Sequence, residues 1–265
     1  MSVYKWNAKD YENHSESQQI WARELISKLS LKGTEKILDI GCGDGKVTAE
    51  IARLVKNGHV VGIDNSSQMI KLAKKRYPNS SSPNLIFEEM DASNLLFTES
   101  FDVIFSNAAL HWIKNHKPLL QGIFNSLKTQ GKIFLQMGGK GNAKDILAVL
   151  ENIISSPEWA PYFSGFGFPY GFYGVEEYRS MVLETGFKIV RIELIPKDMI
   201  HTKKSDMEGW IRTTWLPYTE RIPRDKRDMF INQIASQYIA TKSSDTDGKI
   251  HVSMVRLEVE AIKNG

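Results

Sequence analysis

Three glycines on alternate positions follow a short aliphatic run in the segment 36–45. The next residues, 46–54, carry apolar side chains at helical spacing, so the glycines are predicted to lie on a strand-to-helix turn. Glycine is required where the backbone must turn tightly or approach a ligand closely. A second predicted strand, 59–63, ends in Asp64, where nucleotide-binding α/β folds place the carboxylate that accepts ribose hydroxyls. Together these features predict a site for an adenosine-bearing cofactor.

The glycine spacing separates the candidate cofactors. Dinucleotide sites have the pattern G-x-G-x-x-G, in which a helix N-terminus faces a pyrophosphate. Here the pattern is G-x-G-x-G, with Asp39 before it and Asp44 within it. Two carboxylates repel a pyrophosphate and favour a cationic ligand such as S-adenosyl-L-methionine, which carries an ammonium and a sulfonium. The segment from Leu38 to Gly45 resembles the first motif of the class I S-adenosylmethionine-dependent methyltransferases. A glycine turn without a ligand and a dinucleotide enzyme are the alternatives.

This resemblance implies a set of residues around the cofactor and its product, S-adenosyl-L-homocysteine. Asp64 would bind the ribose, Asp91 would accept from the adenine amino group, and Ala92 would offer its backbone amide. The segment 6–11 is similar to the amino-terminal segment that closes over the cofactor in related enzymes. The predicted cofactor-binding residues are Tyr11, Gln18, Asp39, Gly41, Cys42, Gly43, Gly45, Asp64, Asn65, Met69, Asp91, Ala92, Ser106, Asn107, Ala108 and Trp112.

The segment 106–112, Ser-Asn-Ala-Ala-Leu-His-Trp, follows the fourth predicted strand and faces the methyl group in that family. It lacks the Asn/Asp-Pro-Pro-aromatic signature of enzymes that methylate bases or amide nitrogens. It resembles instead the carboxyl methyltransferases that act on trans-aconitate, juvenile hormone acid and the malonyl carrier protein. The resemblance implies methylation of a carboxylate oxygen, with His111 and Trp112 as catalytic positioning residues. Met137 is followed by Gly138, where the trans-aconitate pattern has proline.

A carboxylate is ionised at neutral pH, so in-line attack on the methyl group needs no general base. An anionic acceptor does need a cationic anchor, and Arg212 between two tryptophans is the first candidate, ahead of Arg221 and Arg179. The predicted substrate-binding residues are Trp159, Tyr162, Trp210, Arg212 and Trp215. Methylation of a hydroxyl, nitrogen or carbon is the alternative, with His111 as the base. A cofactor-binding protein without chemistry is a third interpretation.

Strands alternate with helices from residue 36 to residue 137, which predicts a parallel, doubly wound sheet with its ligand crevice at the carboxyl ends of the strands. The run 250–259 alternates like a last strand at a sheet edge. We therefore expect an α/β protein with a Rossmann-like, mostly parallel, seven-stranded sheet and a mainly helical cap. Residues 31–155, 174–202 and 244–265 would form the core, and 1–30, 156–173 and 203–243 the cap.

Composition narrows the function class. The 265 residues are 42% hydrophobic and 25% charged, with a net charge of +3 and scattered basic residues, so no nucleic-acid partner is expected. One cysteine predicts no intramolecular disulfide, no metal site and a reducing compartment. The polar residues 1–10 and the lack of a long apolar run predict no signal peptide and no membrane partner. We expect a cytoplasmic monomer or homodimer that acts on a small-molecule acceptor.

Overall fold

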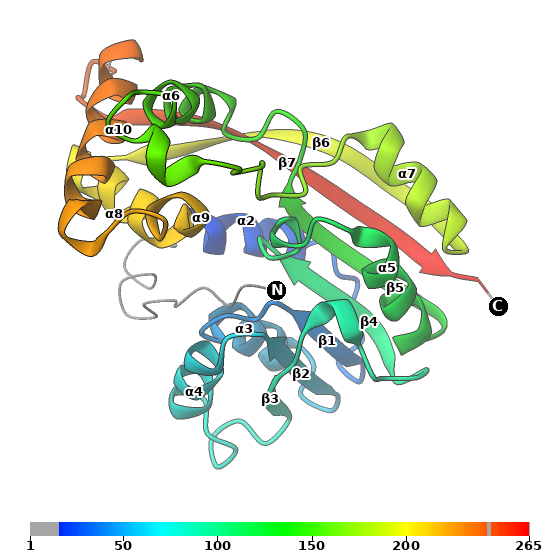
Figure 1. Ribbon diagram of the computed structural model, residues 1–265. Coiled ribbons are helices and arrows are strands. Elements are labelled where there is room, and N and C mark those ends of the chain that lie inside the picture. The colour runs from blue at the N-terminus through cyan, green and yellow to red at the C-terminus, as the bar shows by residue number, and fades with distance from the viewer. Residues whose placement is uncertain (1–15, 243–244, 265) are drawn as a thin grey trace.

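A single seven-stranded sheet organises the protein, as seen in a computed structural model that describes residues 16–242 and 245–264 (Figure 1). The strand order is β3-β2-β1-β4-β5-β7-β6, in which all neighbours are parallel except the pairs that include β7. The strands are β1 Lys36–Ile40, β2 His59–Asp64, β3 Leu85–Glu89, β4 Phe101–Asn107, β5 Leu127–Gly138, β6 Phe187–His201 and β7 Ile250–Lys263. The predicted doubly wound, mostly parallel sheet is confirmed.

Helices connect the strands and cover both faces of the sheet. The helices are α2 Glu16–Ile26, α3 Lys46–Leu54, α4 Ser67–Arg76, α5 His116–Ser126, α6 Lys144–Ile154, α7 Val175–Glu184, α8 Lys204–Thr214, α9 Leu216–Thr219 and α10 Arg227–Thr241. The described residues also form 3₁₀ turns at η1 Ala92–Asn94, η2 Leu110–Trp112, η3 Ala160–Phe163 and η4 Arg224–Lys226. None of the described helices combines the length and the apolar character needed to cross a membrane.

The prediction that 250–259 forms an edge strand is wrong. β7 lies between β5 and β6, and β6 forms the edge. The physical reason is the length of β6, which pairs with β7 from Phe187 opposite Lys263 to His201 opposite Ile250. The alternation in β7 therefore does not mark an exposed edge, since it separates side chains that pack on different faces of an interior strand.

Each face of the sheet is covered by its own apolar cluster. One cluster joins the sheet to α5 and α7 and includes Ile104, Leu120 and Val182. The other joins it to α2, α3 and α4 and includes Leu25, Ile51 and Ile70. Because both faces are buried, the central strands carry consecutive apolar residues, such as Ile37 and Leu38 in β1 and Val103, Ile104 and Phe105 in β4, rather than a strict alternation.

A third apolar cluster lies beyond the sheet and gathers α6, α8, α9 and α10 (Figure 1). β6 and β7 extend past the end of β5 to reach it, because only residues 256–262 of β7 pair with β5. Val252 of β7 packs in the helical cluster, whereas Val259 packs in the core of the sheet. One strand thus fixes the helical end of the molecule relative to the sheet, and Arg256 lies where the two meet.

Candidate active site

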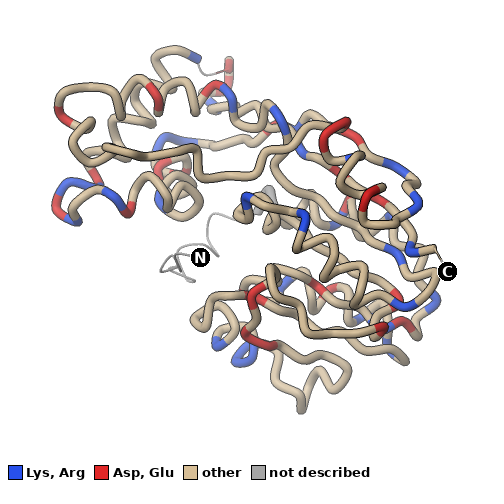
Figure 2. The backbone as a smooth tube through the Cα atoms, turned by 45° about the vertical axis from the view of Figure 1, so that its right-hand side comes forward, with Lys and Arg blue, Asp and Glu red and all other residues tan. Residues whose placement is uncertain are grey.

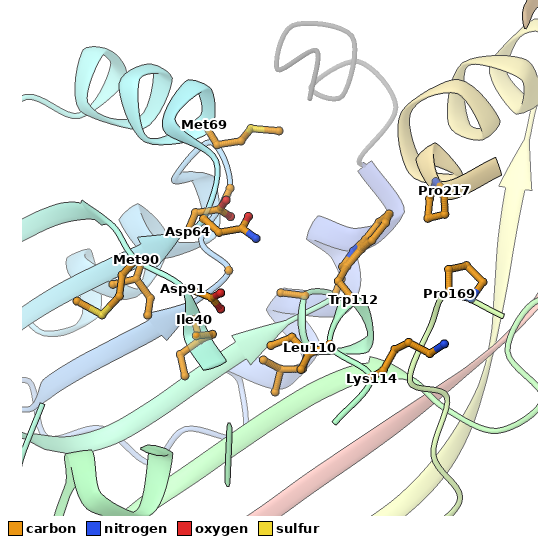
Figure 3. Close-up of a pocket in the computed structure, with 18 of the residues that line it drawn as sticks. Ile40, Asp64, Met69, Met90, Asp91, Leu110, Trp112, Lys114, Pro169 and Pro217 are labelled. Atoms are coloured by element: carbon orange, nitrogen blue, oxygen red, sulfur yellow. The ribbon is translucent and has the colours of Figure 1, made fainter. Parts of the chain in front are cut away.

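A cavity of about 600 Å³ opens at the carboxyl ends of the parallel strands. Ile40, Asp64 and Asn107, which end β1, β2 and β4, all line it. Figure 3 shows Asp64, Met69 and Asp91 on one side of the cavity and Pro169 and Pro217 on the other, with Trp112 between them. This volume lies within the range of ligand pockets, roughly 300–1,000 Å³.

The glycine turn forms one wall of the cavity. Gly41, Gly43 and Gly45 adopt left-handed backbone conformations, with φ of 76°, 54° and 82°. A Cβ on Gly41 would lie 2.1 Å from the Cβ of Ala109, whereas a Cβ on Gly43 would meet no described atom within 4 Å. Gly43 therefore leaves open a space that a side chain would fill, and its backbone is accessible to a ligand.

Three carboxylates surround this turn, and their partners differ. Asp44 pairs with Arg76 at 2.6 Å and with Lys46 at 3.3 Å. Asp39 accepts a hydrogen bond from Thr48 at 2.7 Å, and Asp64 accepts from the backbone amides of Gly43 and Ser66. Within residues 16–242 and 245–264, no lysine or arginine pairs with Asp39 or Asp64.

Burial changes the ionisation of these two groups. It raises the pKa of Asp39 to about 7, with the charge on Asp64 acting in the same direction. Burial also raises the pKa of Asp64. Two buried carboxyls without a cationic partner favour a positively charged ligand, which would stabilise their ionised forms. A ligand with an ammonium and a sulfonium fits this turn, and a pyrophosphate does not.

Asp91, which the sequence predicts to bind the adenine amino group, follows β3 and lines the large cavity. It is exposed, and one of its oxygens accepts from the amide of Ser93 at 2.8 Å. Its other oxygen has no recorded partner in the described part of the chain. Asn65, Met90 and Ala92 complete this side of the cavity. The arrangement provides an apolar slot with a carboxylate acceptor at its rim.

The turn after β4 lies where three cavities meet. Ala108 lines the large cavity, a second cavity beside the glycine turn and a third behind Trp112. Its φ is 56°, an uncommon value for a residue with a Cβ, and its amide donates to the carbonyl of Gln136 at 2.8 Å. The second cavity is lined by Asp39, Cys42 and Gln19, among others.

His111 faces the third cavity in a defined protonation state. The backbone amide of Gly138 donates to Nδ1 of His111 at 3.4 Å. Burial, together with the nearby charge of Arg256, holds the pKa of His111 well below its usual value of 6.5. The imidazole is therefore neutral at pH 7, and its hydrogen is on Nε2. This histidine offers an N–H donor to the cavity rather than a lone pair.

The third cavity, of about 60 Å³, is small and aromatic. Its walls come from segments far apart in the sequence: Ala108, His111, Trp112, Asn142, Tyr170, Phe172, Trp210, Thr214, Trp215, Met254 and Arg256. Tyr170 and Phe172 stack with ring centroids 5.2 Å apart, and Trp112 packs edge-on against Tyr170. Among the described residues that line it, none is an acid.

Most residues predicted to bind the cofactor lie together around these cavities. The large cavity is lined by Gly41, Gly43, Asp64, Asn65, Met69, Asp91, Ala92, Asn107, Ala108 and Trp112. Asp39 and Cys42 line the cavity beside the glycine turn. Gly45 and Ser106 are buried outside the cavities, and Ser106 instead donates to the carbonyl of Ile40 at 2.7 Å. Tyr11 and the side chain of Gln18 lie outside the described residues.

Only two of the five residues predicted to bind the acceptor line a cavity described here. Trp210 and Trp215 line the small cavity. Trp159 and Tyr162 pack in the helical cluster and Arg212 is exposed on α8, so these three line none of the three cavities. The structure adds Asn142 and Arg256 to the small cavity, and Lys114 to the large one. No local motif marks these additions, since each lies in a segment whose pattern indicates only a loop or a strand.

Comparison with known proteins agrees with this geometry. Residues 31–158 match the family model described as a methyltransferase domain. The uncharacterized methyltransferase C70.08c of Schizosaccharomyces pombe is 30% identical over 264 residues, covering 97% of this chain and 98% of that protein. A trans-aconitate 2-methyltransferase of Variovorax paradoxus is 24% identical over 269 residues, covering 97% and 98%.

A solved structure has the same fold. It is the Haemonchus contortus phosphoethanolamine N-methyltransferase 2 in complex with S-adenosyl-L-methionine, with a TM-score of 0.62 and 21% identity. The match covers 97% of this chain and 57% of that chain. The sheet order, the glycine turn with the buried carboxyls of Asp39 and Asp64, and the full-length similarity lead to one conclusion. The chain belongs to the S-adenosylmethionine-dependent methyltransferases.

Proposed function

We propose that this methyltransferase transfers its methyl group to a carboxylate oxygen of a small-molecule acid. One observation carries the proposal: the acceptor side has hydrogen-bond donors and cations but no described base. His111 presents Nε2–H, because Nδ1 already accepts from Gly138. Lys114 and Arg221 line the acceptor end of the large cavity. A hydroxyl or an ammonium must lose a proton before it attacks, whereas a carboxylate is already ionised.

The cofactor would lie between the glycine turn and Asp91. Asp64 and the open backbone at Gly43 would hold the ribose and the amino acid part, and Asp91 the adenine amino group. Asp39 would balance the ammonium through the electrostatics of the turn. When bound, S-adenosylmethionine supplies a methyl group on a sulfonium sulfur, which leaves as a neutral thioether. The acceptor oxygen would lie near Ala108 and Trp112, which line both the large and the small cavity.

The protein then contributes alignment and the exclusion of water. Trp112, Tyr170 and Phe172 enclose the position of the acceptor, and their faces attract a sulfonium charge by about 0.5–2 kcal/mol. Alignment of attacking and methyl atoms at about 3–3.5 Å supplies several kcal/mol of the barrier. Loss of water from the carboxylate makes it a stronger nucleophile. No proton transfer is needed at any step, since a carboxylate and a sulfonium give a neutral ester and a neutral thioether.

Size and charge support a small acceptor. Basic and acidic residues are interspersed along the described backbone (Figure 2), and the net charge is only +3, so the proposal does not include a nucleic acid. The predicted core and cap, the cytoplasmic location and the monomeric or homodimeric state are kept as parts of the proposal. The separate helical cluster supports a cap, but it includes α6 from the predicted core, and α2 from the predicted cap packs on the sheet. The single buried cysteine supports a reducing compartment.

The test is incubation with methyl-labelled S-adenosylmethionine and a pool of small carboxylic acids. We expect a labelled product that releases volatile labelled methanol in mild alkali, as a methyl ester does. Labelled product that survives alkali would refute the proposal and indicate a hydroxyl, nitrogen or carbon acceptor. Cofactor binding with no labelled product from any acid, amine or alcohol would favour a non-catalytic protein.

A further inference from the structure

The small cavity behind Trp112 has the chemistry of an anion site. Trp215 is 4% exposed, and its indole N–H has no hydrogen-bond partner among the described residues. A buried N–H without a partner is unfavourable, so the indole of Trp215 is a donor that a ligand group could satisfy. Trp215 lines the cavity.

Asn142 supplies a second donor whose orientation is fixed. Its Oδ1 accepts from the backbone amide of Val255 at 3.1 Å, so its Nδ2 is the donor end of the amide. Asn142 is buried and lines the same cavity. The amide cannot flip without losing the bond to β7. Three residues that carry N–H donors therefore line the cavity: Trp215, Asn142 and His111.

Arg256 adds positive charge to these donors. It is buried on β7, and its guanidinium lies 4.5 Å from the centroid of the Trp21 ring. Its charge acts on His111, where it lowers the pKa. Among the described residues that line the cavity there is no acid, and Arg256 is the one arginine or lysine, so the charge of the lining favours an anion. The volume of about 60 Å³ exceeds that of a single water and suits a group of a few heavy atoms.

We propose that Trp215, Asn142 and Arg256 form the subsite that binds the carboxylate of the acceptor and presents it to the methyl group. The proposal rests on the proposed function and adds residues that decide which acceptors bind. Ala108 and Trp112 are shared with the large cavity, so a carboxylate in this subsite adjoins the cofactor site. The remainder of the acid would extend toward Phe166, Pro169 and Pro217.

The test is a titration of the protein in complex with S-adenosylhomocysteine, using benzoate as the probe and benzamide as its uncharged counterpart. The indole N–H resonance of Trp215 is assigned by its loss in Trp215→Phe. We expect benzoate to shift this resonance and benzamide to leave it in place. Removal of one hydrogen bond to a charged group in Trp215→Phe should weaken benzoate binding by about 10-fold or more.

Asn142→Asp is the sharper variant, because it keeps the oxygen that accepts from Val255 and replaces the donor with a negative charge. We expect it to weaken benzoate by about 30-fold or more, with unchanged affinity for S-adenosylhomocysteine. Asn125→Asp is the matched control: Asn125 is exposed on α5, its Oδ1 also accepts a hydrogen bond, and the charge added is the same.

The outcomes separate the two proposals. A benzoate shift at Trp215 that Asn142→Asp abolishes supports the subsite, whatever product the labelled assay gives. Ester formation without any response of Trp215 to benzoate overturns the subsite and leaves carboxyl methylation standing. Equal benzoate binding by wild type, Trp215→Phe and Asn142→Asp also overturns it. If benzamide shifted the Trp215 resonance as much as benzoate does, the cavity would not select an anion, and the subsite proposal would be overturned.

Discussion

The two sides of the proposed active site, the cofactor side and the acceptor side, are built in different ways. The cofactor side is made by strand ends and backbone: the glycine turn, Asp39 and Asp64 come from residues 39–64. The acceptor side is made by side chains from segments as distant as His111, Trp215 and Arg256. A backbone-built site depends on local geometry and tolerates little change. A site built from dispersed side chains can change its specificity one residue at a time while the sheet stays intact.

The largest expected effect tests the rigidity of the cofactor side. In Gly41→Ala, a Cβ would lie 2.1 Å from that of Ala109 on a backbone with φ 76°. We expect the affinity for S-adenosylmethionine, measured by calorimetry, to fall by about 100-fold or more, because a displacement of about 1 Å disrupts such a site.

Gly248→Ala is the control for Gly41→Ala. Gly248 has the same φ of 76° but no described atom within 4 Å of its added Cβ. It should lower the free energy of unfolding by about 1–2 kcal/mol without changing cofactor affinity. If Gly41→Ala bound the cofactor as well as Gly248→Ala does, the close approach of the turn would not matter for binding.

The second-largest expected effect is a pH dependence of the affinity for the cofactor, which would come from Asp39 on the cofactor side. Asp39 has a raised pKa of about 7 in the absence of ligand. A cationic ligand favours the ionised form, so affinity should increase with pH up to about 7, by up to about tenfold per unit, and then level off. In Asp39→Asn, which can still accept from Thr48, the component of this increase due to Asp39 should disappear.

The raised pKa of Asp39 has the opposite consequence for the stability of the unliganded protein, which should fall as pH rises. Because the folded-state pKa of Asp39 is above 3.8, the folded state binds more protons than the unfolded state between pH 3.8 and about 7. Asp39 therefore makes the unliganded protein less stable as pH rises through that window. Thermal unfolding of wild type and Asp39→Asn without ligand checks this, and a wild-type profile identical to that of the variant would contradict the shift.

Substitution of His111 on the acceptor side should have a smaller effect on catalysis than the changes above have on cofactor binding. For a carboxylate acceptor, His111→Ala should reduce kcat/KM by about tenfold, the contribution of one hydrogen bond to a charged group. The wild-type kcat at saturating substrates should also show no ionisation of His111 between pH 6 and 9, because its pKa is lowered well below 6.5. A loss of about 10²–10⁴-fold in kcat would identify His111 as a general base and a hydroxyl as the acceptor.

Arg212 should give the smallest effect. Its side chain is exposed on α8 and lines none of the cavities described, so Arg212→Ala should change the KM for the acceptor by no more than about twofold. Arg179→Ala, on the exposed face of α7, should behave alike. A large rise in KM for Arg212→Ala alone would restore the anchor that the sequence suggested and weaken the case for Arg256.

The contrast also explains what could be predicted from the sequence. Gly41, Asp64 and Asp91 follow strands whose apolar runs are recognisable, and parallel strands bring their carboxyl ends together. The order of β6 and β7 in the sheet could not be predicted in the same way, because the alternation of side chains along a strand does not reveal which strands lie beside it.

Only some residues of the proposed acceptor side could be predicted from the sequence, for a physical reason. Trp210 and Trp215 were singled out because large aromatic side chains are conspicuous, and they do line the small cavity. Arg212 lies beside them in sequence but points elsewhere, since neighbours on a helix face different directions. Arg256 lies 41 positions after Trp215, and nothing in its local pattern distinguishes it from other charged residues of a strand.

The interior position of β7 also bears on how the protein is made. Of the strands described, this one leaves the ribosome last, yet it lies between β5 and β6 and carries Arg256 into the small cavity. Until it is synthesised, β5 and β6 present unpaired edges that invite association with other chains. The cofactor side can form earlier from strands already complete. A nascent chain halted before residue 250 would therefore possess the glycine turn and lack an acceptor site.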